Sequence, residues 1–546
     1  MQVHAQATPQ RSGLEYKWVV ALVVIIGVFM SILDQTIVNI AIPRLQTAFG
    51  ADIHSVQWVL TAYILTLGVV TPTSAFFSDR FGIKRVYILS LAAFTLGSAL
   101  CGLAWSLPVL IFFRILQGIG GASLFPLSIT LLFREFPPQQ RGTAMGFFGI
   151  PALLAPAIGP TFGGYLVTYA DWQAIFYINV PVGIFAVILA AISLREAPIY
   201  RNTRFDILGF LFAAAGLGAL LYALSDASTD GWGSTKVLGF LFAGIFVLVL
   251  FVFIELMLAR QEARPLLDLR LFRNGPFATS TIASVFVIFS LFGGIFLFPI
   301  YLQSLRGQSA FQAGLLLLPQ ALASMVTLIL GGRLVDRIGA RVVMIPGLLI
   351  LAFATWQLSF ITLYTPYGWL QLLLIIRGLG FGLCVQPLTV TGLSEMGPRQ
   401  LPQASSINTV TRSVSSSLGI AVLATLVQTQ SKVHYTHLAE QVTQGSPTGQ
   451  LLPAIEAALV ARGADMHAAY TAAIQIIAGM VQRQAYVLAI QDAFRFTLVM
   501  IAVAIIAVFF VRSRRRRAAT IPTTPGGTQQ PVQAEEVQAR SMALVE

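Results

Sequence analysis

Residues 33–43 read LDQTIVNIAIP and place the carboxylate of Asp34 inside the first long apolar run of the chain. A charge at the centre of a membrane-spanning helix costs about 2.5–3.5 kcal/mol on insertion scales. Such a side chain is therefore expected to have a function and to need polar partners from other helices.

The composition predicts an all-helical polytopic membrane protein. Of the 546 residues, 56% are hydrophobic and only 10% are charged, whereas a soluble chain carries about 25% charged residues. A membrane span needs about 20 apolar residues, and this measure predicts about fourteen spans. We place them at 18–42, 56–77, 86–106, 108–132, 142–168, 173–194, 207–225, 237–258, 277–303, 312–332, 342–362, 367–393, 405–429 and 493–511.

The net charge of +12 follows the predicted topology. If the N-terminal segment 1–17 is cytoplasmic, the loops predicted inside carry most of the arginines, and the loops predicted outside carry few. This is the positive-inside pattern, so both termini are predicted to be cytoplasmic. The charge therefore needs no nucleic-acid partner to explain it, and the expected location is the inner or plasma membrane.

Two segments lie outside this regular pattern. Segment 430–492 is predicted to be an external loop with amphipathic helices on the membrane or protein surface, because a span there would move the Arg514–Arg517 cluster outside. Residues 512–546 are expected to form a basic and then disordered cytoplasmic tail. The basic cluster either contacts anionic membrane lipids or simply anchors the last span.

A short motif occurs twice, at matched places between two spans. Residues 79–82 read DRFG and residues 336–339 read DRIG. The motif predicts either a cytoplasmic latch that forms in one conformation or ordinary loop charge. The residues concerned are Asp79, Arg80, Gly82, Asp336, Arg337 and Gly339.

The repeat extends beyond the motif. Between thirty and forty residues after each copy, a span carries an arginine followed by glycines, at Arg114 and at Arg377. Such a parallel internal repeat is typical of transporters that build a site near mid-membrane between two halves. The glycine runs lie inside apolar spans, follow no strand and precede no Walker lysine, so helix packing explains them better than nucleotide binding.

Asp34 and Arg114 are predicted to lie at similar depths in the membrane, so the two side chains can meet inside the bundle. Their pairing indicates either a proton-and-substrate relay or a static ion pair. Gln117 and Asn39 are further polar residues within spans, whereas Arg377 and Arg412 each need a counter-charge, a lipid head group or water.

The fifth span is rich in glycine and proline. Small residues spaced four apart allow close helix contact, and prolines kink a span, so the span is either a hinge or seal between halves or an ordinary packing surface. Its expected hinge residues are Pro156, Gly159, Pro160, Gly163 and Gly164. No catalytic arrangement, metal cluster or cofactor motif is recognised, so the protein is not expected to be an enzyme.

These motifs together resemble the major facilitator superfamily, and within it the fourteen-span drug:proton antiporters of the bacterial multidrug exporter type. The resemblance covers about 18–429 and the last span. It is carried by the stretch 33–43, by Asp79-Arg80 with Gly82, by Arg114 with Gln117 and the following glycines, and by Gly159-Pro160 with Gly163-Gly164. Departures include Ala75 and Ala155, where the family has glycine, and the absence of a carboxylate from 312–332.

The resemblance implies an architecture and a mechanism. The architecture has two six-helix halves (18–194 and 277–511) separated by two extra helices (207–258). The mechanism is proton-coupled export of lipophilic or monocationic compounds by alternating access, driven by the proton gradient without a cofactor. Two alternatives stay open at this point: export of lipids or an endogenous metabolite, and a permease subunit that serves a periplasmic adaptor.

Overall fold

A computed structural model describes residues 15–199, 205–227, 230–260, 266–443 and 445–511. Within these ranges the regular secondary structure is helical and no strand occurs. The predicted tail 512–546 and most of the N-terminal segment 1–17 lie outside the described residues.

The first half contains six predicted spans, several of them built from two shorter helices. A bend of 58° separates α2 from α3, after the Thr71-Pro72 pair. The elements are α1 (Tyr16–Phe49), α2 (Ile53–Val70), α3 (Thr73–Phe81), α4 (Ile83–Gly102), α5 (Leu107–Gly121), α6 (Leu124–Glu135), η1 (Pro138–Gln140), α7 (Arg141–Phe148), α8 (Ile150–Tyr169), α9 (Ala174–Tyr177) and α10 (Asn179–Ser193).

The two extra helices and the second half follow. The extra helices are α11 (Ile207–Asp226) and α12 (Thr235–Arg260). The second half contains η2 (Leu269–Arg273), α13 (Gly275–Ile300), η3 (Tyr301–Leu305), α14 (Ala310–Ile338), α15 (Ala340–Leu358), α16 (Tyr367–Cys384), α17 (Pro387–Ser394), α18 (Leu401–Glu440), α19 (Leu451–Val460) and α20 (Met466–Phe509).

Helices lie at the positions of the predicted spans. Among the described residues, 11 helices are long and apolar enough to cross a membrane, and up to 12 if the bent pair α2–α3 is one span. Together with the α7–α8 pair and α13, these helices occupy all the predicted spans. The expectation of an all-helical, polytopic membrane protein is confirmed.

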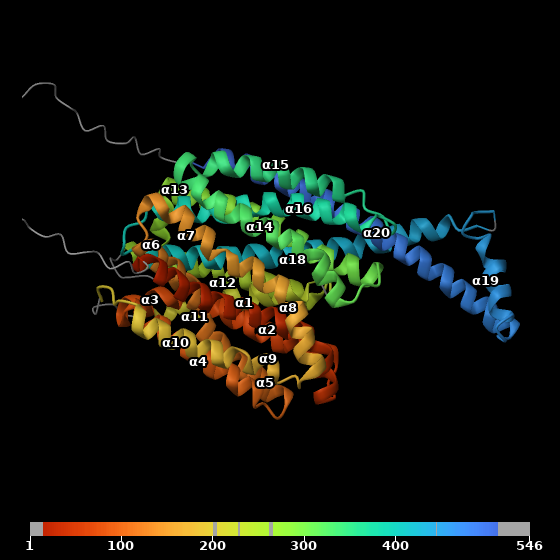
Figure 1. Cartoon of the computed structure of the whole chain (residues 1–546), viewed down its shortest axis with the longest axis horizontal. Helices are drawn as coiled ribbons and strands as arrows, with labels where there is room; N and C mark the ends of the chain where they lie inside the picture. The colour runs from red at the N-terminus through yellow and green to blue at the C-terminus, as the bar shows by residue number, and fades with distance from the viewer. Residues whose placement is uncertain (1–14, 200–204, 228–229, 261–265, 444, 512–546) are drawn as a thin grey trace, which may run out of the picture. The chain divides into compact units, whose positions relative to one another are not determined.

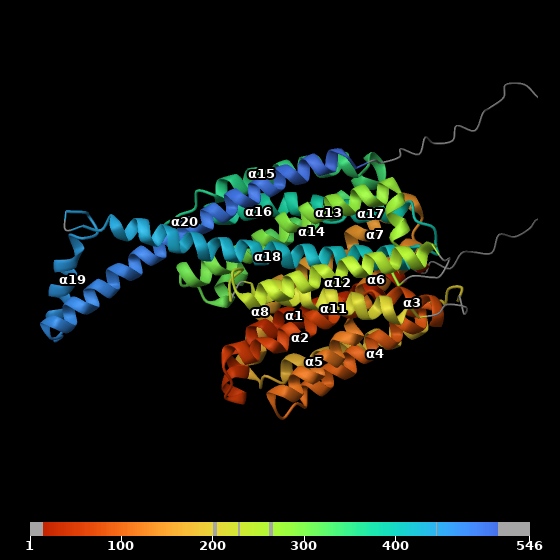
Figure 2. The ribbon, with the colours of Figure 1, turned by 180° about the vertical axis from the view of Figure 1, so that it is seen from behind.

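The extra helices lie beside both halves. α11 and α12 pack against each other, and α11 also contacts α2 of the first half and α18 of the second (Figure 2). At the end of this hairpin, the indole nitrogen of Trp232 donates a 2.6 Å hydrogen bond to Thr425 Oγ1 on α18. The pair therefore forms part of the bundle wall, although it interrupts the repeat in sequence.

Segment 430–492 differs from the surface-lying loop expected from the sequence. α18 is 40 residues long and α20 is 44, so both continue past the length that a span requires. They extend together beyond the other helices, with α19 at the far end of the extension (Figure 1). His434 and Asp492, 2.7 Å apart, join the two helices at its base. The polar residues that argued against a span are compatible with a helical extension outside it.

Both copies of the repeated motif lie on helix ends and not in open loops. Asp79 and Arg80 belong to the last turn of α3, and Gly82 follows with φ +93°. Asp336 and Arg337 occupy the last turn of α14, and Gly339 follows with φ +89°. Left-handed backbone angles of this kind are accessible to glycine and costly for other residues. Each glycine therefore permits the sharp turn into the next helix.

We expect Gly82→Ala to lower the free energy of unfolding by about 1–3 kcal/mol, the usual range for backbone strain of this kind. Its Cβ would also lie 2.5 Å from the Glu196 carboxylate. Gly239→Ala on α12 is the control, because its Cβ would have no atom within 4 Å. Thermal unfolding of the purified variants tests this, and equal midpoints would contradict the assignment.

Candidate functional site

Asp34 and Arg114 form an ion pair in the interior of the first half. Arg114 Nη1 on α5 lies 2.6 Å from Asp34 Oδ2 on α1, and both side chains are fully buried. Among the described residues, Asp34 and Glu255 are the only buried carboxylates. The predicted meeting of Asp34 with Arg114 is therefore seen in the structure, although its function is not decided by this contact.

Two amides complete the surroundings of the carboxylate. Gln117 Nε2 donates to Asp34 Oδ1 at 3.0 Å, and Asn179 Nδ2 donates to the same oxygen at 2.9 Å. Gln117 lies one helical turn after Arg114, so both reach the carboxylate from one face of α5. Asn179 is the first residue of α10 and also donates to Ser98 Oγ at 3.1 Å.

The guanidinium of Arg114 is held from several sides. Its Nε donates to the carbonyl oxygen of Val59 on α2 at 3.0 Å, and Nη1 also donates to Gln117 Oε1 at 2.7 Å. The ring of Tyr63 lies 4.2 Å from the guanidinium carbon, close enough for a cation–π interaction. Nη2 has no hydrogen-bond partner in the described part of the chain.

This arrangement links the charge of Asp34 to that of Arg114. While Asp34 is ionised, the pair is neutral and the carboxylate accepts three hydrogen bonds from side chains. A proton on Asp34 would leave the arginine as an uncompensated buried charge, which is costly in a low-dielectric interior. Any group that neutralises or repositions the arginine therefore affects how readily Asp34 takes a proton.

The second half keeps the arginine of the repeat but not the acid. Arg377 is 1% exposed, and its Nη2 donates to the carbonyl oxygen of Leu291 at 3.4 Å. Arg377 Nε and Nη1 lack hydrogen-bond partners among the described residues. Of the three partners expected for Arg377, which were a counter-charge, a lipid head group or water, the described residues supply no counter-charge.

Arg412 and Asn39 lie apart from the Asp34 cluster. Arg412 donates to the Val385 carbonyl at 3.4 Å and lies 5.9 Å from the ring of Phe125, so it reaches from α18 to the first half. Asn39 is exposed and lines a cavity beside α11. Sequence reasoning grouped them with Gln117 as polar residues within spans, but only Gln117 contacts Asp34.

Asp336 joins the two halves at the end of the bundle where α1 begins. Its Oδ1 accepts from the backbone nitrogen of Gly142 at 2.7 Å. Its Oδ2 accepts from both the backbone nitrogen and the hydroxyl of Thr143 at 2.8 Å. A carboxylate is favourable at this position because α7 begins there, where helix N–H groups are unpaired.

Other contacts at this end also cross between the halves. Arg141 Nη1 donates to the Ser394 carbonyl at 3.1 Å, and Thr130 Oγ1 donates to Ser405 Oγ at 3.2 Å. A Cβ on Gly142 would lie 2.3 Å from the Gly332 carbonyl oxygen, so α7 and α14 meet backbone to backbone. Arg337 is exposed beside a cavity of about 500 Å³, Asp79 is half-buried and Arg80 is exposed.

The glycines of the fifth span serve two different contacts. Gly159 and Gly163 face Thr36 and Ile37, the residues that follow Asp34 closely on α1. The earlier Gly146 faces the Leu328 carbonyl of α14 in the second half. Gly159 and Gly163 therefore pack against the helix of Asp34, and the contact with the second half is made by the earlier Gly146.

The remaining expected hinge residues contribute less to these contacts. Pro156 is exposed, and a Cβ on Gly164 would meet no atom within 4 Å. The side chain of Pro160 lies outside the described part of the chain. The packing alternative of the sequence analysis accounts for Gly159 and Gly163, whereas a hinge function for this span stays a prediction.

Sequence reasoning missed several members of the site. Asn179 lies in the sixth predicted span, and its polar side chain within an apolar run was the signal available for it. Tyr63, Ser98 and Val59 carried no signal, because a tyrosine, a serine or a backbone carbonyl in a span is ordinary. Their roles depend on which helices face one another.

The chain belongs to the major facilitator superfamily. The profile described as "Major Facilitator Superfamily" matches residues 24–206 and 201–420. A relative from Bacillus subtilis, described as an uncharacterized MFS-type transporter, is 32% identical over 93% of this chain and 96% of its own length. The chain is therefore an integral membrane protein of a transporter family.

Other relatives carry names that refer to drug resistance or export. Multidrug resistance protein Stp of Mycobacterium tuberculosis is 34% identical over 74% of both chains. The tetracenomycin C resistance and export protein of Streptomyces glaucescens is 32% identical over 76% of this chain and 77% of its own. The chain is thus similar to transporters of the superfamily that are named for multidrug resistance and drug export.

Solved structures agree with the fold alone. The human organic anion transporter MFSD10 has a TM-score of 0.57 at 13% identity, covering 89% of this chain and 100% of its own. The proton:xylose symporter XylE has a TM-score of 0.53 at 15% identity, covering 88% of this chain and 96% of its own. Identities this low carry no information on what this chain transports.

We expect Arg114→Met to lower the free energy of unfolding by about 3–5 kcal/mol, because it leaves a buried carboxylate without its counter-charge. The double variant Asp34→Asn/Arg114→Met is expected to recover part of this loss, since its site is neutral. Thermal unfolding of the purified proteins measures both. A double variant less stable than Arg114→Met would contradict the buried-pair account.

Proposed function

We propose that this protein is a proton-coupled antiporter that exports lipophilic or monocationic compounds across the cytoplasmic membrane by alternating access. The observation that carries the proposal is the buried Asp34 carboxylate, paired with Arg114 and hydrogen-bonded to two amides. The names of relatives such as Stp support the substrate class. The proton gradient supplies the energy.

In this cycle Asp34 carries the proton. Protonation from the outside breaks the neutral pair with Arg114, shifts the neighbouring helices and releases the substrate outward. Loss of the proton to the cytoplasm restores the pair and the substrate affinity. The proposal assigns coupling to the first half alone, because Arg377 contacts a backbone carbonyl and no carboxylate among the described residues.

Asp336 acts as the cytoplasmic latch in the same cycle. Its three hydrogen bonds to Gly142 and Thr143 hold α14 against α7 and close the end at which α1 begins. Opening this end requires the bonds to break, and each bond to a charged group contributes about 1.5–3 kcal/mol. A latch of this strength is reversible when protonation of Asp34 and release of the substrate favour the form that is open to the cytoplasm.

We expect inverted membrane vesicles containing the wild type to take up ethidium when a pH gradient is imposed. Asp34→Asn should abolish this uptake, because an amide cannot exchange a proton. Glu440→Gln is the matched control, since Glu440 is exposed on the extension of α18. Fluorescence of the accumulated dye measures transport.

The outcomes of the transport experiment separate the components of the proposal. Equal uptake by wild type and Asp34→Asn would exclude Asp34 from coupling and would direct attention to Glu255, the other buried carboxylate of the described chain. Uptake by neither protein would contradict the proposed class of substrate and favour lipid or metabolite cargo. Equal ethidium uptake with and without the imposed pH gradient would contradict proton antiport.

We also expect Asp336→Ala to open the end of the bundle that it joins. A reporter cysteine at Ser405, a fully buried residue bonded to Thr130 across the halves, should then react about tenfold faster with a soluble maleimide. The native Cys101 and Cys384 are buried and serve as internal controls. Asp268→Ala is the control variant, because Asp268 pairs locally with Arg270. Unchanged reactivity would contradict the latch.

A further inference from the structure

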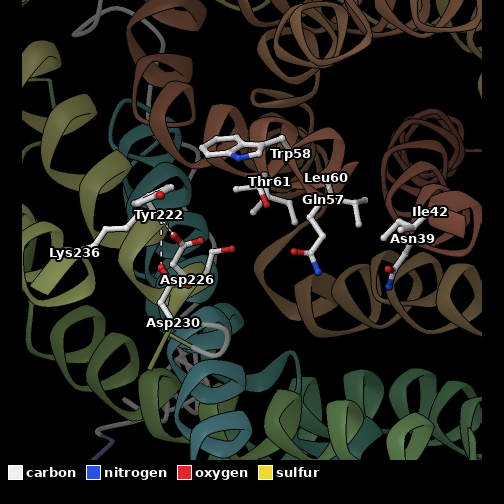
Figure 3. A pocket seen from close by; sticks show the side chains of 12 residues that line it. Asn39, Ile42, Gln57, Trp58, Leu60, Thr61, Tyr222, Asp226, Asp230 and Lys236 are labelled. Atoms are coloured by element: carbon white, nitrogen blue, oxygen red, sulfur yellow. Dashed lines mark hydrogen bonds and ion pairs between the residues drawn. The ribbon is translucent and has the colours of Figure 1, made fainter. Parts of the chain in front are cut away.

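A cavity of about 560 Å³ lies between the first half and the two extra helices. Residues of α1 and α2 line one side, and residues of α11, α12 and the turn between them line the other (Figure 3). The cavity lies toward the C-terminal end of α1, away from Asp336. Its volume is within the range of about 300–1,000 Å³ that small-molecule sites occupy.

Two aromatic rings form one wall of the cavity. Trp58 on α2 and Tyr222 on α11 are stacked, with ring centroids 5.7 Å apart and an interplanar angle of 23°. Trp58 is 40% exposed, so part of its ring is accessible to a ligand. Stacked rings that border a cavity offer a flat apolar surface to an aromatic ligand.

The cavity already holds one cationic group, which comes from the chain itself. Lys236 Nζ lies 2.6 Å from Asp226 Oδ2 and 3.4 Å from Asp230 Oδ2. It also lies 5.2 Å from the centre of the Tyr222 ring. Carboxylates together with an aromatic face are the usual surroundings of a bound organic ammonium group. Two aspartates and one lysine leave the group with a net negative charge.

The opposite side of the cavity carries two side-chain amides. Figure 3 shows Gln57 and Asn39 at the part of the cavity across from Lys236. Neither side-chain amide makes a hydrogen bond within the described part of the chain, in contrast to Gln117 and Asn179 in the Asp34 cluster. Amides of this kind can donate to or accept from polar groups of a ligand.

We propose that this cavity is a second binding site, specific for monovalent organic cations with a flat aromatic body. The cationic group replaces the Lys236 ammonium between Asp226, Asp230 and the Tyr222 ring. The aromatic body stacks along Trp58, and polar substituents meet Gln57 and Asn39. The Lys236 ammonium group competes with the ligand for these carboxylates. Its side chain is half-exposed and flexible, so it can move to solvent when a ligand enters.

This site gives the two extra helices a role in ligand binding. Neither side of the cavity is complete alone, because Trp58 belongs to the first half while the carboxylates belong to the α11–α12 hairpin. The site shares no residue with the Asp34 cluster. The proposal concerns binding and holds whether or not Asp34 couples transport to protons, although it names the same substrate class as the proposed function.

The test is a titration of purified full-length Asp34→Asn protein with ethidium, followed by the fluorescence of the dye. The Asp34→Asn background separates this site from any binding that depends on the Asp34 carboxylate. Adding Lys236→Gln should tighten binding about fivefold, and adding Asp226→Asn should weaken it about fivefold, the range expected for exposed charge pairs. Tyr222→Leu should also weaken it, since the aromatic face is lost.

Controls distinguish a binding site from a structural ion pair. Glu440→Gln should leave the affinity unchanged, and a neutral aromatic dye should respond to neither charge variant. Thermal unfolding identifies any variant that fails to fold. If Asp226 and Lys236 only fasten α11 to α12, both substitutions lower stability and leave ethidium affinity unchanged. Unchanged affinity would overturn the proposal. So would affinity changes in the same direction for Lys236→Gln and Asp226→Asn, or no ethidium binding in the Asp34→Asn background.

Discussion

The hydrogen-bonded ion pair between Asp34 and Arg114 is the constraint around which the first half is built. A fully buried carboxylate and guanidinium are tolerated only when each has partners, so α1, α2, α5 and α10 must all meet at one point. Close helix packing makes this possible, because Gly159 and Gly163 bring α8 directly against α1 beside Asp34. The same packing leaves the pair sensitive to any movement of these helices.

The two halves use the same repeated sequence for different purposes. The first half retains the buried acid opposite its arginine, whereas the second half presents Arg377 to the carbonyl of Leu291. Conversely, Asp336 of the second half holds the start of α7. The buried acid Asp34 therefore lies in the first repeat, and Asp336, which joins the halves, lies in the second. The α7–α8 segment contacts both α1 and α14. That segment is the physical connection between them.

The sequence predicted the spans, the internal repeat and the Asp34–Arg114 pair, because these depend on hydrophobicity, spacing and the cost of buried charge. It did not predict Asn179, Tyr63 or the cavity beside Tyr222, because these depend on which faces of distant helices meet. The extension of α18 and α20 was predicted as an external loop with amphipathic helices on a surface, whereas these helices continue the two spans outward. The polar residues of segment 430–492 indicate where the membrane-spanning parts end, but they do not determine how far α18 and α20 continue as helices.

The most direct measurement of the central claim is proton release on substrate binding. Purified protein in weakly buffered detergent solution is mixed with ethidium, and a pH-sensitive dye follows the free proton concentration. The account predicts that, in a series of measurements at different starting pH values, the wild type releases protons on binding and Asp34→Asn releases none. Equal release by both proteins, or binding to the wild type without release across the whole pH range, would contradict the claim that Asp34 exchanges a proton for substrate.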